Sequence, residues 1–142
     1  MLIPVLLILN SFIIIQESKA QWVQTAFTYN YNATDIEATD SSIHIAFLQY
    51  GIYRSYDNGN SVTALNNGLP GLLQIPCVKI KDNMMYAGNL YDGIYKSTNN
   101  GLNWFSINDS STNSLWVYDI YKFNQSLFIV TTNSIFMSTN EG

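Results

Sequence analysis

The sequence has 142 residues, of which 11% are charged and 14% are aromatic, and its formal net charge is −4. This length suits one modest domain, and the abundance of aromatic residues over Lys and Glu favours strands and turns over exposed helices. Six Lys and Arg residues spread along the chain cannot form a basic face, so a nucleic acid partner is not expected.

Residues 1–20 are predicted to be a secretory signal peptide. Residues 1–15 are largely apolar, and a short polar stretch follows. Ser18 and Ala20 are small residues that fit the −3 and −1 positions of a signal-peptidase site. We therefore expect cleavage after Ala20 and a secreted or otherwise extracytoplasmic mature chain with no stable membrane span. An uncleaved membrane anchor is the alternative, although the apolar run is short for a span.

The rest of the chain carries a repeat with a period of 42 residues. Gly51 and Gly93 are 42 residues apart, and so are Gly59 and Gly101, whereas Gly142 follows Gly101 by 41. A four-stranded propeller blade takes roughly 40–45 residues. The domain therefore spans residues 21–142, and its units are approximately residues 21–59, 60–101 and 102–142.

Each unit is predicted to form four short antiparallel strands. In the second unit these are residues 76–81, 84–88, 93–97 and 103–107, which are rich in Val, Ile, Tyr and Phe. A repeat of paired helices would need a 3.6-residue periodicity, which is absent. By its place in the repeat, the segment 22–25 is expected to be a fourth strand that no earlier strands precede. The predicted fold is all-β, with about three blades of an incomplete β-propeller.

One short motif, Ser-x-Asp/Asn-x-Gly, closes each unit. An Asp or Asn side chain can accept hydrogen bonds from nearby backbone N–H groups and hold a turn. A glycine adopts the positive φ of such a turn at little cost. We therefore predict structural turns at Ser55, Asp57 and Gly59, at Ser97, Asn99 and Gly101, and at Ser138, Asn140 and Gly142.

These motifs resemble the Asp-box, or BNR repeat, S-x-D-x-G-x-x-W. It is found in sialidases, sortilin-type receptors, xyloglucanase-like glycosidases and the photosystem II assembly factor family. The resemblance implies a turn between the third and fourth strands of a propeller blade, at its periphery and away from the central site. Asn99 and Asn140 depart from the pattern by replacing Asp, and Val62 by replacing Trp. A catalytic or metal role for Asp57 is therefore not predicted.

Three blades do not surround a channel, because propellers have roughly four to eight. We expect the sequence to be a fragment of a longer propeller. A chain that self-associates to complete the ring, or an open stack with exposed edges, are the alternatives.

No catalytic, metal or cofactor site is predicted. The resemblance implies three arginines for a sialidase site, and Arg54 is the only one, so a complete site is absent. Asp35 and Asp119 hold equivalent positions on predicted first strands, with Cys77 between them, so both are candidates to line a central channel. They are either polar strand ends meeting water or a glycosidase carboxylate pair. Cys77 is expected to be a small buried residue.

The loops offer candidates for ligand contact. Tyr50, Tyr91 and Asp92 precede predicted third strands, and Trp116 lies beside a first strand. Exposed aromatic side chains there would suit a glycan or a protein ligand, and packing between blades is the alternative. The sequence favours a secreted, non-enzymatic binding or structural propeller over an enzyme. The alternative is part of an extracellular glycoside hydrolase, sialidase-like or xyloglucanase-like.

Overall fold

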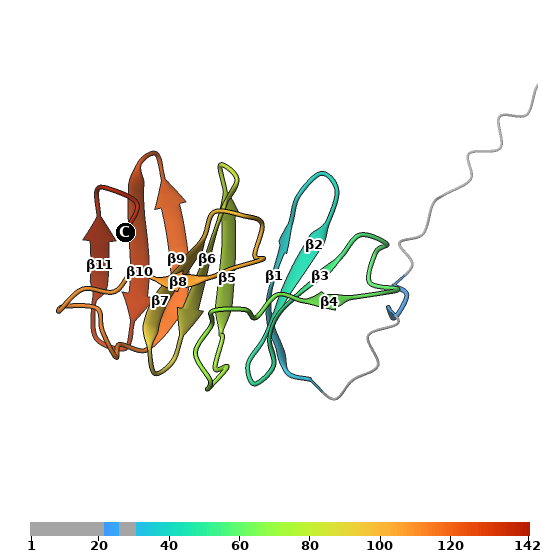
Figure 1. The fold of residues 1–142 in the computed structure, drawn as a ribbon, viewed down its shortest axis with the longest axis horizontal. Helices are drawn as coiled ribbons and strands as arrows, with labels where there is room; N and C mark the ends of the chain where they lie inside the picture. The colour runs from blue at the N-terminus through green and yellow to red at the C-terminus, as the bar shows by residue number, and fades with distance from the viewer. Residues whose placement is uncertain (1–21, 26–30) are drawn as a thin grey trace, which may run out of the picture.

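The computed structural model describes residues 22–25 and 31–142, and its regular secondary structure there consists of strands in three antiparallel sheets (Figure 1). The predicted signal peptide, residues 1–20, lies outside the described residues. Among those residues no helix is long and apolar enough to cross a membrane. The strands are β1 (Ala33–Ala38), β2 (Ile43–Phe47), β3 (Gly51–Ser55), β4 (Thr63–Ala64), β5 (Cys77–Lys81), β6 (Met84–Asn89), β7 (Gly93–Ser97), β8 (Phe105–Ser106), β9 (Val117–Phe123), β10 (Ser126–Thr131) and β11 (Ile135–Ser138).

Each sheet is a simple meander in which every strand pairs with the next one in the chain. The first sheet has the order β1-β2-β3-β4, the second β5-β6-β7-β8 and the third β9-β10-β11. This confirms the predicted all-β class and the four antiparallel strands per unit in the first two sheets. The third sheet has three strands.

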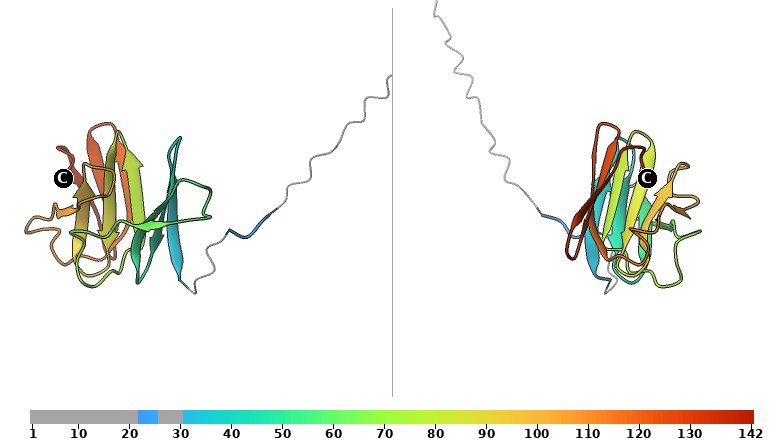
Figure 2. Two further views of the ribbon diagram at one scale, coloured as in Figure 1. Left: turned by 45° about the vertical axis from the view of Figure 1, so that its right-hand side comes forward. Right: turned by 90° about the vertical axis from the view of Figure 1, so that its left-hand side faces the viewer.

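The first strands of the three sheets lie next to one another. β1 packs beside β5, and β5 packs beside β9, so the sheets form a row in chain order, which Figure 2 shows from two sides. We call the contact between the first and second sheets the first junction, and the contact between the second and third sheets the second junction.

Apolar side chains fill both junctions and form the core. Matching positions of the repeat are buried in the second and third sheets: Val78 and Ile120 are 1% and 2% exposed, and Met85 and Leu127 are buried too. Full burial of one such side chain stabilises the fold by about 1.5–3 kcal/mol. The first junction holds Ala46, Ile52, Leu65, Ile75, Val78, Met85, Ala87, Tyr95 and Trp104. The second holds Cys77, Tyr86, Ile94, Val117, Ile120, Leu127 and Ile129.

The predicted strand at residues 22–25 is wrong. The structure has no strand there, and the side chains of Trp22 and Val23 are 97% and 75% exposed. A fourth strand forms only by pairing with a third strand, as β4 pairs with β3 and β8 with β7. No described strand pairs with residues 22–25 in this way.

The predicted fourth strand at residues 103–107 is also too long, because β8 covers only Phe105–Ser106. Its pairing with β7 ends where a side chain replaces the backbone as partner. Ile107 N still donates to Ile94 O at 3.1 Å, but Ile94 N donates to the Asn108 side-chain oxygen at 2.8 Å. Asn108 thereby stops the ladder.

The thiol of Cys77 is buried at the second junction, 3% exposed. Burial is the largest cause that raises its pKa far above the usual value, and the carboxylates of Asp119 and Asp35 add to the effect. Because the thiolate is the reactive form, we expect Cys77 to resist alkylation by iodoacetamide in the folded protein and to react fully in urea. Rapid labelling without denaturant, followed by mass spectrometry, would contradict the buried position.

Candidate functional site

The first Ser-x-Asp-x-Gly turn lies between β3 and β4, and its side chains bond its own backbone. Ser55 Oγ accepts from Gly59 N at 2.8 Å and donates to Asp57 Oδ1 at 2.8 Å. Asp57 also accepts from the Ser61 hydroxyl and backbone N–H, at 2.7 and 2.8 Å. The Ser61 hydrogen bonds, then that from Ser55, lower the pKa of Asp57 to about 2. The carboxylate is therefore engaged in holding the turn.

The other two turns repeat this geometry with an amide in place of the carboxylate. Ser97 Oγ accepts from Gly101 N at 3.0 Å, and Asn99 Oδ1 accepts from Asn103 N at 2.9 Å. At the third turn Ser138 Oγ accepts from Gly142 N at 2.9 Å and donates to Asn140 Oδ1 at 2.6 Å. Because an amide oxygen accepts these bonds as a carboxylate does, Asn serves at the Asp position.

The two candidate channel carboxylates sit near the starts of first strands and cap backbone N–H groups. Asp35 accepts from Ile36 N at 2.8 Å and, across the first junction, from Val78 N at 2.9 Å. Asp119 accepts from Ile120 N at 2.8 Å. Both carboxylates lie close enough to Cys77 to affect its pKa. The structure thus places them on one line of first strands, with both oxygens of Asp35 engaged.

The candidate aromatic residues of the loops fall into two groups. Tyr91 and Trp116 meet edge to face, with ring centroids 5.6 Å apart, and their side chains are 50% and 45% exposed. Asp92 accepts from the Tyr95 hydroxyl at 2.5 Å. Tyr50 instead stacks on Tyr31, with centroids 3.7 Å apart. Only Tyr91 and Trp116 are therefore brought together as an exposed pair.

Beside this pair lies an open pocket of about 350 Å³ at the third sheet. Trp116 forms one wall, and the turn between β10 and β11 forms another. Half-exposed aromatic rings next to a pocket of this size are suited to stacking on a sugar ring or an apolar side chain. The described residues contain no group of three or more His, Cys, Asp or Glu that could hold a metal ion.

Solved structures resemble this chain in fold. An ancestral GH74 enzyme aligns over 79% of this chain with a TM-score of 0.65 and 19% identity. YCF48 from Cyanidioschyzon merolae aligns over 87%, with a TM-score of 0.67 and 17% identity. The fold is that of a β-propeller. The computationally designed Ika4 protein is also similar, over 75% of this chain, with a TM-score of 0.58 and 8% identity.

The three sheets are accordingly propeller blades. The chain spans 17% of the length of the GH74 enzyme, 38% of YCF48 and 64% of Ika4, so it corresponds to part of a propeller. No protein-family model and no curated protein matches the sequence.

Sequence reasoning missed a clasp that anchors the loop carrying Tyr91 and Asp92. Asn108 accepts from Ile94 N and donates from its amide to Asp92 O at 2.7 Å. Asn66 makes the same two bonds in the first blade, to Ile52 N and Tyr50 O. The signal was present, because Asn66 and Asn108 are 42 residues apart.

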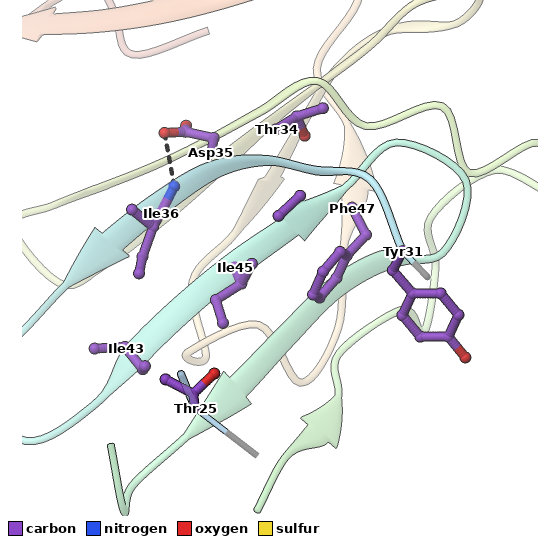
Figure 3. A pocket seen from close by; sticks show the side chains of 9 residues that line it. Thr25, Tyr31, Thr34, Asp35, Ile36, Ile43, Ile45 and Phe47 are labelled. Carbon is purple, nitrogen blue, oxygen red and sulfur yellow. Dashed lines mark hydrogen bonds between the residues drawn. The ribbon is translucent and has the colours of Figure 1, made fainter. Parts of the chain in front are cut away.

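The open face of the first blade is apolar (Figure 3). We call it the leading face; Ile36, Ile43, Ile45 and Phe47 lie on it, around an open pocket of about 530 Å³. The side chain of Ile36 is 61% exposed, whereas the repeat-equivalent Val78 is 1% exposed at the first junction. The leading face thus carries the side chains of a blade junction without a described blade against it.

The open face of the third blade, which we call the trailing face, is apolar as well. The side chain of Ile135 is 69% exposed, whereas the repeat-equivalent Ile94 is 3% exposed and Ile52 is fully buried. The same face includes the half-buried Phe128 and the exposed Val130. Both ends of the three-blade row therefore present the surfaces that its two internal junctions bury.

Proposed function

We propose that this chain is a segment of a longer, exported β-propeller that acts as a binding or structural module and not as an enzyme. One observation carries the proposal. Ile36 on the leading face and Ile135 on the trailing face are largely exposed, while their repeat equivalents are buried. Large exposed apolar patches mark surfaces that another structure covers.

The covering structure that fits both faces is a further blade of the same repeat, supplied by the same longer chain. A leading face is covered at each internal junction by the trailing face of the preceding blade, through apolar packing and cross-junction hydrogen bonds. Thr34 Oγ1, for example, donates to Ile75 O at 3.0 Å across the first junction. The repeat thus supplies its own complementary surface.

The engagement of the carboxylates supports a non-enzymatic role. Asp35 accepts two backbone N–H groups, and Asp57 accepts three hydrogen bonds within its turn. The exposed Tyr91–Trp116 pair supports binding, because rigid aromatic rings on an anchored loop suit a glycan or a protein hot spot. The proposed ligand surface is therefore the Tyr91–Trp116 end of the propeller.

A second candidate, part of an extracellular glycoside hydrolase, is favoured by the likeness to an ancestral GH74 enzyme. In this reading Asp119 would be a channel carboxylate, and its partner would come from another blade. Glycoside hydrolysis needs two facing carboxyl groups.

The coding sequence beyond Gly142 tests the segment proposal. We expect an open reading frame with further Ser-x-Asp-x-Gly units in register. A stop codon directly after Gly142, with a native mass of two copies in size-exclusion chromatography with light scattering, would replace the longer chain by a second copy. N-terminal sequencing of the secreted protein is expected to start at Gln21, and a retained residue 1 would contradict the cleaved signal.

The complete secreted protein tests the functional choice. We expect glycans from a soluble polysaccharide panel, or captured proteins, to bind without turnover, and Trp116→Ala to weaken binding, with exposed Tyr118→Ala as the matched control. Release of reducing sugar from any member of the panel, abolished by Asp119→Asn, would contradict the proposal and establish the hydrolase.

A further inference from the structure

The second junction holds a carboxylate between two ammonium groups. Glu141 Oε1 lies 2.5 Å from Lys122 Nζ, and Glu141 Oε2 lies 3.8 Å from Lys96 Nζ. Lys96 also donates to Glu141 O at 3.1 Å. Lys122 is buried, and the hydrogen bond from its ammonium is the largest cause that lowers the pKa of Glu141. An anionic group is thus built into this junction.

At the first junction the matching positions keep a cation but lack the carboxylate. Arg54 stands at the Lys96 position and Asn100 at the Glu141 position. Arg54 Nη1 donates to Asn100 O at 3.4 Å, which repeats the backbone bond of Lys96. Arg54 Nε is buried and has no hydrogen-bond partner, and none of the ion pairs among the described residues includes Arg54. Its guanidinium therefore has no counter-ion there.

His44 adds a second unsatisfied group at the same place. It occupies the position of Tyr86 and is 3% exposed, and neither ring nitrogen has a hydrogen-bond partner. Burial, and then the charge of Arg54, lower the pKa of His44 to about 4, so the imidazole is neutral at pH 7. Buried polar groups without partners are rare in native proteins and call for a physical reason.

An open pocket of about 270 Å³ lies against both groups. Besides His44 and Arg54, its charged and titratable lining groups are Asp40 and Tyr56. The Tyr56 ring lies under the guanidinium, 4.7 Å from its carbon to the ring centroid. The pocket is far larger than the roughly 30 Å³ that one water occupies in the liquid. A ligand of several heavy atoms can therefore enter beside the unpaired cation.

We propose that this pocket binds a small carboxylate anion, which bonds the Arg54 guanidinium and the His44 imidazole and takes the place of the Glu141 carboxylate of the second junction. Arginine and carboxylate form strong, often bidentate, charge-assisted hydrogen bonds. The ligand also supplies acceptors for the donors that the protein leaves unmet. This site is independent of the Tyr91–Trp116 end and of the number of blades in the full chain.

Nuclear magnetic resonance of the tag-free secreted protein tests the site, because His44 is the only histidine. The probe is sodium acetate at about pH 6.5, where acetate is ionised and His44 is neutral. We expect saturable shifts of the His44 ring resonances and a rise in the His44 pKa, because a nearby anion favours imidazolium. Shifts that sodium chloride of equal ionic strength reproduces would overturn the proposal.

Asn100 provides a matched pair of variants. Asn100→Glu places a carboxylate on the side chain that matches Glu141, so we expect it to fill the site and weaken acetate binding at least roughly ten-fold. Asn100→Gln has the same length without the charge and should bind acetate within about two-fold of the parent. Equal acetate affinity for both folded variants would overturn the proposal.

Discussion

Replacing Trp104 by alanine is expected to lower the free energy of unfolding by about 3–5 kcal/mol. The Trp104 side chain is 5% exposed and belongs to the cluster that fills the first junction. Its Nε1 donates to Leu65 O of the preceding blade at 2.7 Å, and Trp104 N donates to Asn67 O at 2.9 Å. The substitution therefore opens a cavity and leaves the Leu65 carbonyl unpaired.

Urea unfolding followed by circular dichroism measures this loss without relying on tryptophan fluorescence. Phe105→Ala is the matched control, because the neighbouring ring is 48% exposed and its loss should cost less than about 1 kcal/mol. Trp104→Phe keeps most of the packing but removes the hydrogen bond, so we expect an intermediate loss of about 1–3 kcal/mol. Equal stability of Trp104→Ala and Phe105→Ala would show that this ring does not hold the two blades together.

The parts of the fold that the sequence predicted depend on local chemistry repeated at a fixed spacing. The third strand of the second unit, Gly93–Ser97, has the predicted bounds. It lies between a polar loop and a turn whose partners, such as Ser97 and Gly101, are four residues apart. Because such bonds form within one short segment, the residue types alone indicate them.

The parts that the sequence did not predict depend on contacts between distant residues. The bond from Val78 N to Asp35 crosses 43 residues, and Tyr50 finds its stacking partner in Tyr31 and not among the other candidate loop residues. The short fourth strand follows from a side chain, Asn108, that replaces a backbone partner. Neither alternation nor propensity carries these facts, because each needs the relative position of two strands or blades.

The candidate carboxylate pocket shows the same limit from another side. Arg54 looked structural in the sequence because it matches Lys96, and that equivalence holds for its backbone bond to the next blade. What differs is the partner from the following unit, Asn100 in one junction and Glu141 in the other. Only the packed structure brings that residue next to His44 and shows an unpaired cation. Equivalent positions in a repeat therefore need not be functionally equivalent.

Replacing Gly101 by alanine is expected to lower the free energy of unfolding by about 2–4 kcal/mol, because two effects add. Gly101 has a φ of +80°, a conformation that costs an L-residue about 1–2 kcal/mol. A Cβ at this position would also lie 2.8 Å from Leu65 Cδ1 and 3.3 Å from Met85 Sδ, and overpacking a core typically costs about 1–3 kcal/mol. The turn thus packs directly on the fourth strand of the preceding blade.

Gly71→Ala is the matched control, since a Cβ there meets nothing within 4 Å and the residue does not have a positive φ. It should change the unfolding free energy by less than about 0.5 kcal/mol. A double-mutant cycle separates the two effects: in a Leu65→Ala background the steric clash is relieved, so Gly101→Ala should cost only the backbone strain of about 1–2 kcal/mol. If the cost of Gly101→Ala is the same in both backgrounds, the glycine serves its own turn alone, and the fit of the turn against the next blade does not require it.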